Sequence, residues 1–270
     1  MTEAVEPPAP KRTSTILGGL GRHLRRQDWF AVSLELLIVV LGVYLGLQAN
    51  AWAAARADER RSDAYVERLI VEMEADRRTR QELAAYYDAV FDSAERAHAL
   101  LLAPSQDAPA LVINAYRASE YNYSPPTSST WDEIVSSGDL ALIPSAALDG
   151  ASAYFRDDTA RTVSDPLRAS PYRRTVRSLL SHEVQKAIRE GCSDVLDAHN
   201  QITGFRQDCD LKVSRAEIDV AARALRSDPQ VLRDLRYQFS TVANARTNLR
   251  ADIIFLDSAL SSLRASRTKR

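Results

Sequence analysis

The chain has 270 residues with a formal net charge of −1, and its hydrophobic content of 45% is enough to build a core in one large domain or two small ones. This charge balance gives no overall field that would attract a polyanion, so we expect no nucleic-acid partner. Glycine is sparse at 9 residues, and the dominance of Ala, Leu, Arg, Asp and Ser favours an all-α protein over a sandwich or a barrel.

Residues 1–28 form a polar N-terminal tail in this interpretation. The first half contains Pro7, Pro8 and Pro10 and is expected to be flexible. The second half has a basic amphipathic pattern, with leucines on one helical face beside arginines: Leu17, Leu20, Leu24, Arg22, Arg25 and Arg26. Such a segment suits the surface of an anionic inner leaflet, although it is equally consistent with a simple basic flank.

Residues 29–50 are predicted to be a transmembrane helix. The 19 residues from Trp29 to Leu47 contain one acidic side chain, Glu35, and as a helix they would cover about 28 Å, roughly one hydrocarbon core. Trp29 and Trp52 bracket the run, as interface anchors do. A cleaved signal peptide is the competing interpretation, but the apolar run is too long and lacks a convincing cleavage site.

The orientation of this helix in the membrane is inferred from the lengths of the segments on its two sides. The charges of these segments do not decide it, because arginines flank the helix on both sides. Short basic tails stay in the cytoplasm, whereas long domains cross the membrane largely regardless of charge. We therefore expect a single-pass protein of the bacterial inner membrane, with residues 1–28 cytoplasmic and residues 51–270 forming a periplasmic helical domain.

Glu35, Gly42 and Gly46 lie on one stripe of the predicted span, with a G-x-x-x-G spacing between the two glycines. Such a stripe lets two helices approach closely, and a carboxyl on it would find a partner across the interface. Alternatively, Glu35 lies near the inner edge of the membrane and reaches the headgroups or is protonated there.

Three segments carry a resemblance to a known family. The anchor residues Glu35, Gly42, Leu47-Gln48, Asn50 and Trp52, the segment STWDEIVSSGDLALI at 129–143, and ALDGASAYFRD at 147–157 occur in that order. They resemble a family of bacterial single-pass membrane proteins known only as a domain of unknown function. The departures from its usual pattern are Leu34, Ala51, Trp131 and Ile134. The resemblance implies a membrane-anchored helical protein and supplies no catalytic residue, substrate or cofactor.

The anchor is predicted to continue into a long exported helix, because the 57 residues between Gly46 and Pro104 contain neither Gly nor Pro. Its apolar positions alternate by three and four, as in a coiled coil: Val66, Leu69, Met73, Leu83, Tyr87, Val90, Ala94, Ala97 and Leu101. A final helix after Asp228 repeats this rhythm: Leu232, Leu235, Phe239, Val242, Leu249, Ile253, Leu256, Leu260 and Leu263.

These two apolar stripes most simply cover each other as an antiparallel pair in an elongated bundle. Pairing Asp76 with Arg246 sets the expected register, in which Tyr87 faces Leu235 and Val66 faces Leu256. The alternative is a parallel dimer through the same stripes, in which identical charges would meet.

The residues between these helices are expected to form shorter elements. Residues 110–128 are turn-rich and contain Tyr116, Tyr121 and Tyr123, which either pack on the bundle or offer a stacking surface to a ligand. A capping box at Thr130 and Glu133 should begin a helix that Gly138 ends. Helices at 145–163 and 167–190 are expected to be split at Asp165-Pro166, with Gly191 closing the second, and a second capping box lies at Ser214 and Glu217. The sequence predicts no strand.

Cys192 and Cys209 lie 17 residues apart around a polar loop, which in an oxidising periplasm predicts one disulfide. A metal site using both cysteines and His199 is the alternative, but the spacing matches no usual zinc site.

We expect neither a metal nor a cofactor, and no catalytic residue, because no nucleophile, phosphate-binding or metalloprotease motif is present. The protein is therefore not expected to be an enzyme. The expected partners are the lipid bilayer and either a second copy of the chain or an envelope protein. Two functions stay open, an interaction or scaffold module and a ligand-responsive sensory module that relays through a partner.

Overall fold

The computed structural model describes residues 29–103 and 107–268. The predicted basic amphipathic tail, residues 1–28, lies outside these described residues. By its internal contacts the chain divides into two units, residues 1–59 and residues 60–270, and we describe each unit by itself. Every side chain from Trp29 to Arg56 is exposed in this structure.

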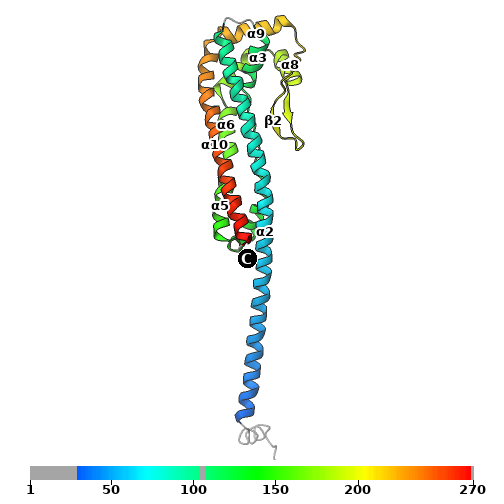
Figure 1. Cartoon of the computed structure of the whole chain (residues 1–270), viewed down its shortest axis with the longest axis vertical. Helices are drawn as coiled ribbons and strands as arrows, with labels where there is room; N and C mark the ends of the chain where they lie inside the picture. The colour runs from blue at the N-terminus through cyan, green and yellow to red at the C-terminus, as the bar shows by residue number, and fades with distance from the viewer. Residues whose placement is uncertain (1–28, 104–106, 269–270) are drawn as a thin grey trace, which may run out of the picture. The chain divides into compact units, whose positions relative to one another are not determined.

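The second unit is all-α and is organised by two long helices. Helix α2 runs from Trp29–Leu102, and its part beyond residue 60 packs against α10, Pro229–Thr268. The two helices lie side by side and run in opposite directions (Figure 1). The alternating pattern predicted both helices correctly, and its leucines Leu69, Leu83, Leu249 and Leu260 are at most 1% exposed.

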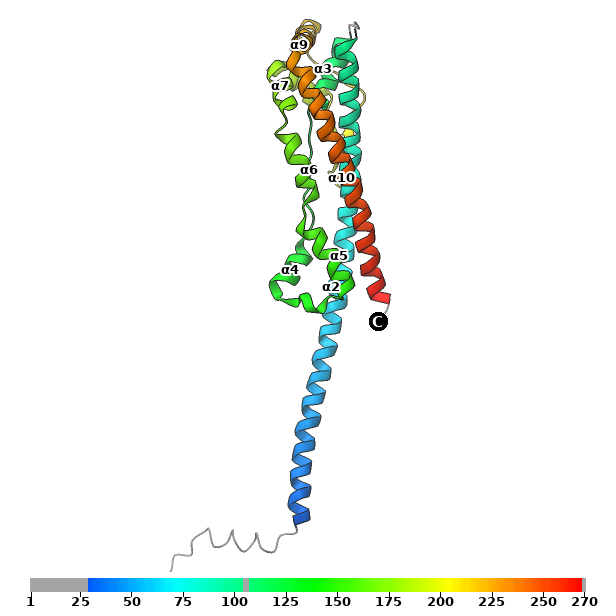
Figure 2. The same ribbon diagram turned by 90° about the vertical axis from the view of Figure 1, so that its left-hand side faces the viewer.

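The remaining helices of this unit are short and connect the two long ones. They are α3 (Ala108–Arg117), α4 (Ser129–Ser137), α5 (Ser145–Arg156), α6 (Thr159–Arg168), α7 (Pro171–Leu179), α8 (His182–Gly191) and α9 (Arg215–Ser227), with a 3₁₀ turn η1 at Asp139–Leu142. Helix α10 contacts α5, α6 and α7 along its length, and these three helices form a column beside it (Figure 2).

The short helices differ from the prediction in where they begin and end. Residues 110–117 are helical rather than turn-rich, and the expected helices at 145–163 and 167–190 are four helices, α5 to α8. Side chains that accept a hydrogen bond from a backbone N–H three residues later begin several of them: Asp107 for α3, Asp158 for α6, Ser170 for α7 and Ser181 for α8.

The expected break at Asp165-Pro166 is absent, and Pro166 lies inside α6. Proline in a helix interior removes a hydrogen bond and crowds the preceding turn. Ala160, Val163 and Leu167 are buried on the same helix, and this packing offsets the local cost. The chain instead breaks at residues 157–158 and 169–170.

The helix boundaries predicted at Ser214 and Gly138 are confirmed. Ser214 and Glu217 form a capping box at the start of α9, each accepting a hydrogen bond from the other's backbone N–H. Gly138 ends α4 with φ +78°, a left-handed conformation that favours glycine.

The capping box predicted at Thr130 and Glu133 is wrong. Thr130 lies inside α4 and is buried, and its N–H and hydroxyl both donate to the carboxylate of Glu72 on α2, at 3.1 Å and 2.7 Å. Glu133 instead pairs with Arg68 of α2. A carboxylate from the neighbouring helix therefore satisfies the N-terminus of α4, and a local motif could not reveal it.

Contrary to the prediction, the loop between the cysteines contains two short strands. Strand β1 (Asp194–Leu196) pairs antiparallel with β2 (Ile202–Phe205), with an irregularity after Val195. Just before it, α8 ends at Gly191 as predicted. A Cβ at position 191 would lie 2.1 Å from the carbonyl oxygen of Asp210, so glycine is required here because two backbones approach closely.

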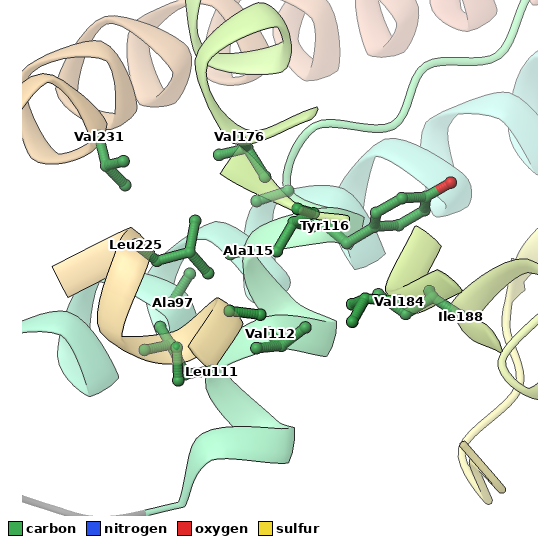
Figure 3. Close-up of a cluster of buried hydrophobic side chains, with 14 of the residues drawn as sticks. Ala97, Leu111, Val112, Ala115, Tyr116, Val176, Val184, Ile188, Leu225 and Val231 are labelled. Carbon is green, nitrogen blue, oxygen red and sulfur yellow. The ribbon is translucent and has the colours of Figure 1, made fainter. Parts of the chain in front are cut away.

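The core consists of three clusters of buried side chains arranged along the long helices. One joins the first buried turns of α2 with α5 and the end of α10. A middle cluster surrounds Tyr86, Tyr87 and Leu249. The third, centred on Leu111, Leu225 and Val231, packs α3, α7, α8 and α9 together. In Figure 3 the ring of Tyr116 extends from this third cluster toward Val184 and Ile188 of α8.

Candidate functional site

The N-terminal part of α2 is long and apolar enough to cross a membrane. The predicted anchors Trp29 and Trp52 are 80% and 63% exposed. Glu35 is exposed, and a Cβ added at Gly42 or Gly46 would meet no atom within 4 Å. The predicted stripe of Glu35, Gly42 and Gly46 is therefore exposed, and its association with a second helix stays a prediction.

The charges between α2 and α10 are paired differently from the prediction. Arg246 donates to Asp88 rather than to Asp76, and Arg250 donates to Asp88 as well, at 2.9 Å. Asp88 lies about three helical turns beyond Asp76, so the register set by Asp76 and Arg246 is wrong. Inside the seam, Arg80 pairs with Asp252, with 3.2 Å between Nε and Oδ2 and exposures of 1% and 8%.

The corrected register also changes the apolar neighbours. Tyr87 belongs to the middle cluster with Val242 and Leu249, whereas Leu235 packs with Ala94 in the third cluster. The expected pairing of Tyr87 with Leu235 is therefore wrong. Val66 and Leu256, the other expected pair, do belong to one cluster.

Asp76 has no need of a guanidinium across the seam because a loop and a tyrosine satisfy it. The backbone N–H of Thr127 donates to both carboxylate oxygens, at 2.9 Å and 3.1 Å, and the Tyr154 hydroxyl donates to one of them at 3.0 Å. Burial raises the pKa of Asp76, against the opposing effect of these hydrogen bonds and of Arg80. Burial likewise raises the pKa of Asp252.

The structure joins Cys192 and Cys209 in a disulfide, with 4.8 Å between their Cα atoms. The bond closes the loop that contains the β1–β2 hairpin. Because both sulfurs are bonded to each other, they are not free to ligate a metal together with His199. His199 is exposed and lies 3.7 Å from Asp197.

The three tyrosines singled out in the sequence each carry an arginine on one ring face. The guanidinium carbon lies over the ring at 3.2 Å for Arg177 on Tyr116, at 4.9 Å for Arg173 on Tyr121 and at 5.1 Å for Arg161 on Tyr123. The aromatic residues therefore position cations of the chain itself. The prediction that they pack on the bundle and the prediction of a stacking surface both missed these arginines.

One of these arginines, Arg173, lines a pocket of about 310 Å³ between α3, α7, α8 and the hairpin. The pocket is lined by charged and aromatic side chains that include Tyr116, Arg117, Glu120, Arg173, Arg189 and Asp194. Glu120 accepts from Arg173 at 3.3 Å and from Arg177, just behind the lining, at 2.9 Å.

This pocket is the candidate functional site, and the sequence analysis did not identify its arginines. They come from three helices separated by the chain folding back on itself, so no spacing pattern connects them. The one available signal was the tyrosine-bearing segment, since Tyr116 and Tyr121 line the same pocket.

Comparison of the chain with family models, with curated proteins and with solved structures found no match.

Proposed function

We propose that this chain is a membrane-anchored module of the bacterial cell envelope, whose helical domain acts by binding another protein. In this proposal residues 29–50 cross the inner membrane, residues 1–28 are cytoplasmic, and residues 51–270 form the periplasmic domain. The resemblance of residues 35–52, 129–143 and 147–157 to a membrane-anchored family of unknown function is consistent with it and stays a prediction.

One observation carries the proposal. The same helix, α2, begins with an apolar stretch whose side chains are all exposed and ends with a stripe of buried side chains in the bundle. An exposed apolar stretch of this length is costly in water and is stable in a bilayer. A disulfide in the other unit supports an oxidising compartment for residues 60–270.

Reporter fusions test the topology. Alkaline phosphatase fused after Arg270 should be active, and the same fusion in a chain lacking residues 29–50 should be inactive because the domain is no longer exported. An inactive full-length fusion combined with an active cytoplasmic reporter at the same position would reverse the proposed orientation.

Site-specific photocrosslinking tests the binding role. Ile254 on α10 and Val71 on α2 are large apolar side chains that are 70% and 61% exposed, whereas Ser258 is an exposed polar position on α10. A crosslinker at Ile254 or Val71 should give a defined adduct with an envelope protein, and one at Ser258 should not. A chain that yields no adduct at any position and purifies as a monomer would contradict the scaffold role.

Self-association through the anchor is a separate outcome with its own variants. Gly42→Ile and Gly46→Ile should weaken association of the isolated segment in a membrane two-hybrid assay, because added bulk separates helix backbones. Unchanged association would exclude this stripe as the interface.

The second candidate function is a ligand-responsive module that relays its state through a partner. The pocket at Arg117 favours it, because ligand sites are concave and this one brings several charged side chains together. Ligand-dependent change in the crosslinking pattern would distinguish this role from that of a static scaffold.

A further inference from the structure

Arg117 is a buried cation that forms no ion pair within residues 29–103 and 107–268, because the opposite charge of Asp194 acts on it only from beyond ion-pair distance. Its side chain lies at the end of α3 and is 93% buried, since the residue is 7% exposed. Its Nη2 atom donates to the backbone carbonyl of Arg206 and contacts the sulfur of Cys209 at 3.3 Å. Within residues 29–103 and 107–268, its buried Nε has no hydrogen-bond partner, and no ion pair involves its guanidinium.

Such an arrangement is uncommon, because buried charges are normally paired and buried donors normally have an acceptor. The environment shows the cost, since burial lowers the pKa of Arg117. The guanidinium also lies over the ring of Phe205 at 5.0 Å, which holds it at the wall of the pocket instead of letting it reach solvent.

Arg189 adds a second cation from α8, and unlike Arg117 it is exposed. Its Nε donates to the Tyr116 hydroxyl at 3.0 Å, and no carboxylate among the described residues forms an ion pair with it. Arg173 and Arg177, by contrast, share Glu120. Three guanidiniums, of Arg117, Arg173 and Arg189, line the pocket, and that of Arg177 lies behind it on Glu120. Against the two carboxylates Glu120 and Asp194, these four arginines leave a net charge of +2 when both acids are ionised.

The walls of the pocket come from elements that hold one another in place. Cys192 and Ser193 follow α8 directly, Asp194 begins β1 and Phe205 ends β2. The disulfide fixes the base of this hairpin. The arginines on α3, α7 and α8 therefore converge on one space from rigid positions, which is what selective anion binding requires.

We propose that this pocket binds a small oxyanion of charge −2, held by Arg117 and Arg189. The planar guanidinium fork matches phosphate-type and carboxylate oxygens in a bidentate manner. A volume of about 310 Å³ is at the lower end of the range for ligand sites, so the ligand is a small molecule rather than a polymer. This proposal concerns ligand binding alone. It does not depend on the proposed envelope role, because the pocket would bind the anion in any compartment.

Calorimetric titration of the purified full-length chain in detergent tests the proposal. The probes are sulfate, a tetrahedral dianion, and malonate, a dicarboxylate, at constant ionic strength maintained with chloride. Saturable binding of one stoichiometric dianion is expected, and the probe that binds more tightly identifies the class of headgroup. No saturable binding of either probe up to about 10 mM, a weak affinity on the usual scale, would overturn the proposal.

Variants connect the binding to the pocket. Arg117→Gln and Arg189→Gln should each weaken binding at least about tenfold, since each loses a charge-assisted contact. Arg174→Gln, on the same helix as Arg173 but exposed, is the matched control and should leave the affinity unchanged. Asp194→Asn should tighten binding, because it removes a negative charge from the wall.

The set remains decisive if the buried variant does not fold. The side chains of Arg189 and Asp194 are exposed whereas that of Arg117 is buried, so their variants report on the pocket independently. Equal affinities for wild type, Arg189→Gln and Asp194→Asn would overturn the proposal even if sulfate binds, because the ion would then occupy another place. Failure here would leave the proposed membrane topology intact, since the reporter fusions do not depend on the pocket.

Discussion

Arg80 and Arg117 are both buried, at 1% and 7% exposure, but their surroundings differ. Arg80 lies between the two long helices, pairs with Asp252 and donates to the Ser124 carbonyl at 2.8 Å. Arg117 lies at a pocket and, within the described part of the chain, forms no ion pair, because Asp194 lies beyond ion-pair distance. Burial alone therefore does not tell what a charge does. A paired arginine holds the α2–α10 seam in register, whereas an arginine without a counter-ion offers its charge to a ligand.

The largest expected effect comes from removing Arg80, the arginine that forms an ion pair. Arg80→Ala should lower the free energy of unfolding by about 3–5 kcal/mol, because it leaves Asp252 buried without its partner. Arg117→Gln should cost less, since no carboxylate loses its counter-ion. Denaturant unfolding of the full-length chain, followed by circular dichroism, measures both.

Replacing the whole pair is the control for this experiment. Arg80→Met combined with Asp252→Leu should recover most of the lost stability, because a well-packed apolar pair avoids the desolvation of two charges. If Arg80→Ala and Arg117→Gln lowered the free energy of unfolding equally, the ion pair of Arg80 would not distinguish the two arginines in stability.

Removing the disulfide tests whether this bond supports the pocket at Arg117. Cys192→Ser with Cys209→Ser should destabilise the chain by about 3 kcal/mol, the chain-entropy value for a loop of this length. Sulfate affinity should fall as well, because Ser193, Asp194 and Phe205 lie between the two cysteines and line the pocket. Loss of stability with unchanged sulfate affinity would show that the hairpin is dispensable for binding.

The seam register allows a smaller but sharper test. A double-mutant cycle of Asp88→Ala and Arg246→Ala should give a coupling of less than about 1 kcal/mol, because both side chains are partly exposed and screened by solvent. The matched cycle with Asp76→Ala and Arg246→Ala should be additive. Coupling in the second cycle and not in the first would restore the register expected from sequence.

The smallest expected effect is a pH dependence at Asp76. Because burial raises its pKa in the folded state, the folded chain holds this proton above the ordinary value of 3.8. Wild type should therefore lose stability relative to Asp76→Asn as pH rises through that window. Thermal unfolding of both proteins from pH 4 upward measures this. If wild type instead gained stability relative to Asp76→Asn as pH rises, the interactions of Asp76 with Thr127, Tyr154 and Arg80 would outweigh the effect of burial on its pKa.

The long helices were predictable because their signal is repeated. Leu69, Leu83, Leu249 and Leu260 recur at three-and-four spacing over many turns, so errors at single positions cancel. The short helices depend on single N-cap side chains. Ser170 caps α7 just before a proline, but the boundary was predicted at Asp165-Pro166 instead.

The register and the pocket were not predictable for a common reason. Asp76 accepts hydrogen bonds from a backbone N–H and a tyrosine, Thr130 donates to Glu72, and Arg117 and Arg189 line one pocket from different helices. Each arrangement brings together residues far apart in sequence, and each involves a charge with several available partners. Opposite charges in two stripes therefore predicted that a pairing exists, but not which one.

The disulfide also determines when the pocket is completed. Oxidation of Cys192 and Cys209 fixes the wall formed by Ser193, Asp194 and Phe205, and on the proposed topology it follows export. On that topology, a newly made chain still in the reducing cytoplasm has the arginines but lacks the disulfide that fixes the hairpin beside them. Maturation of the site would then coincide with arrival in the envelope, so that the abundant anions of the cytoplasm do not fill it beforehand.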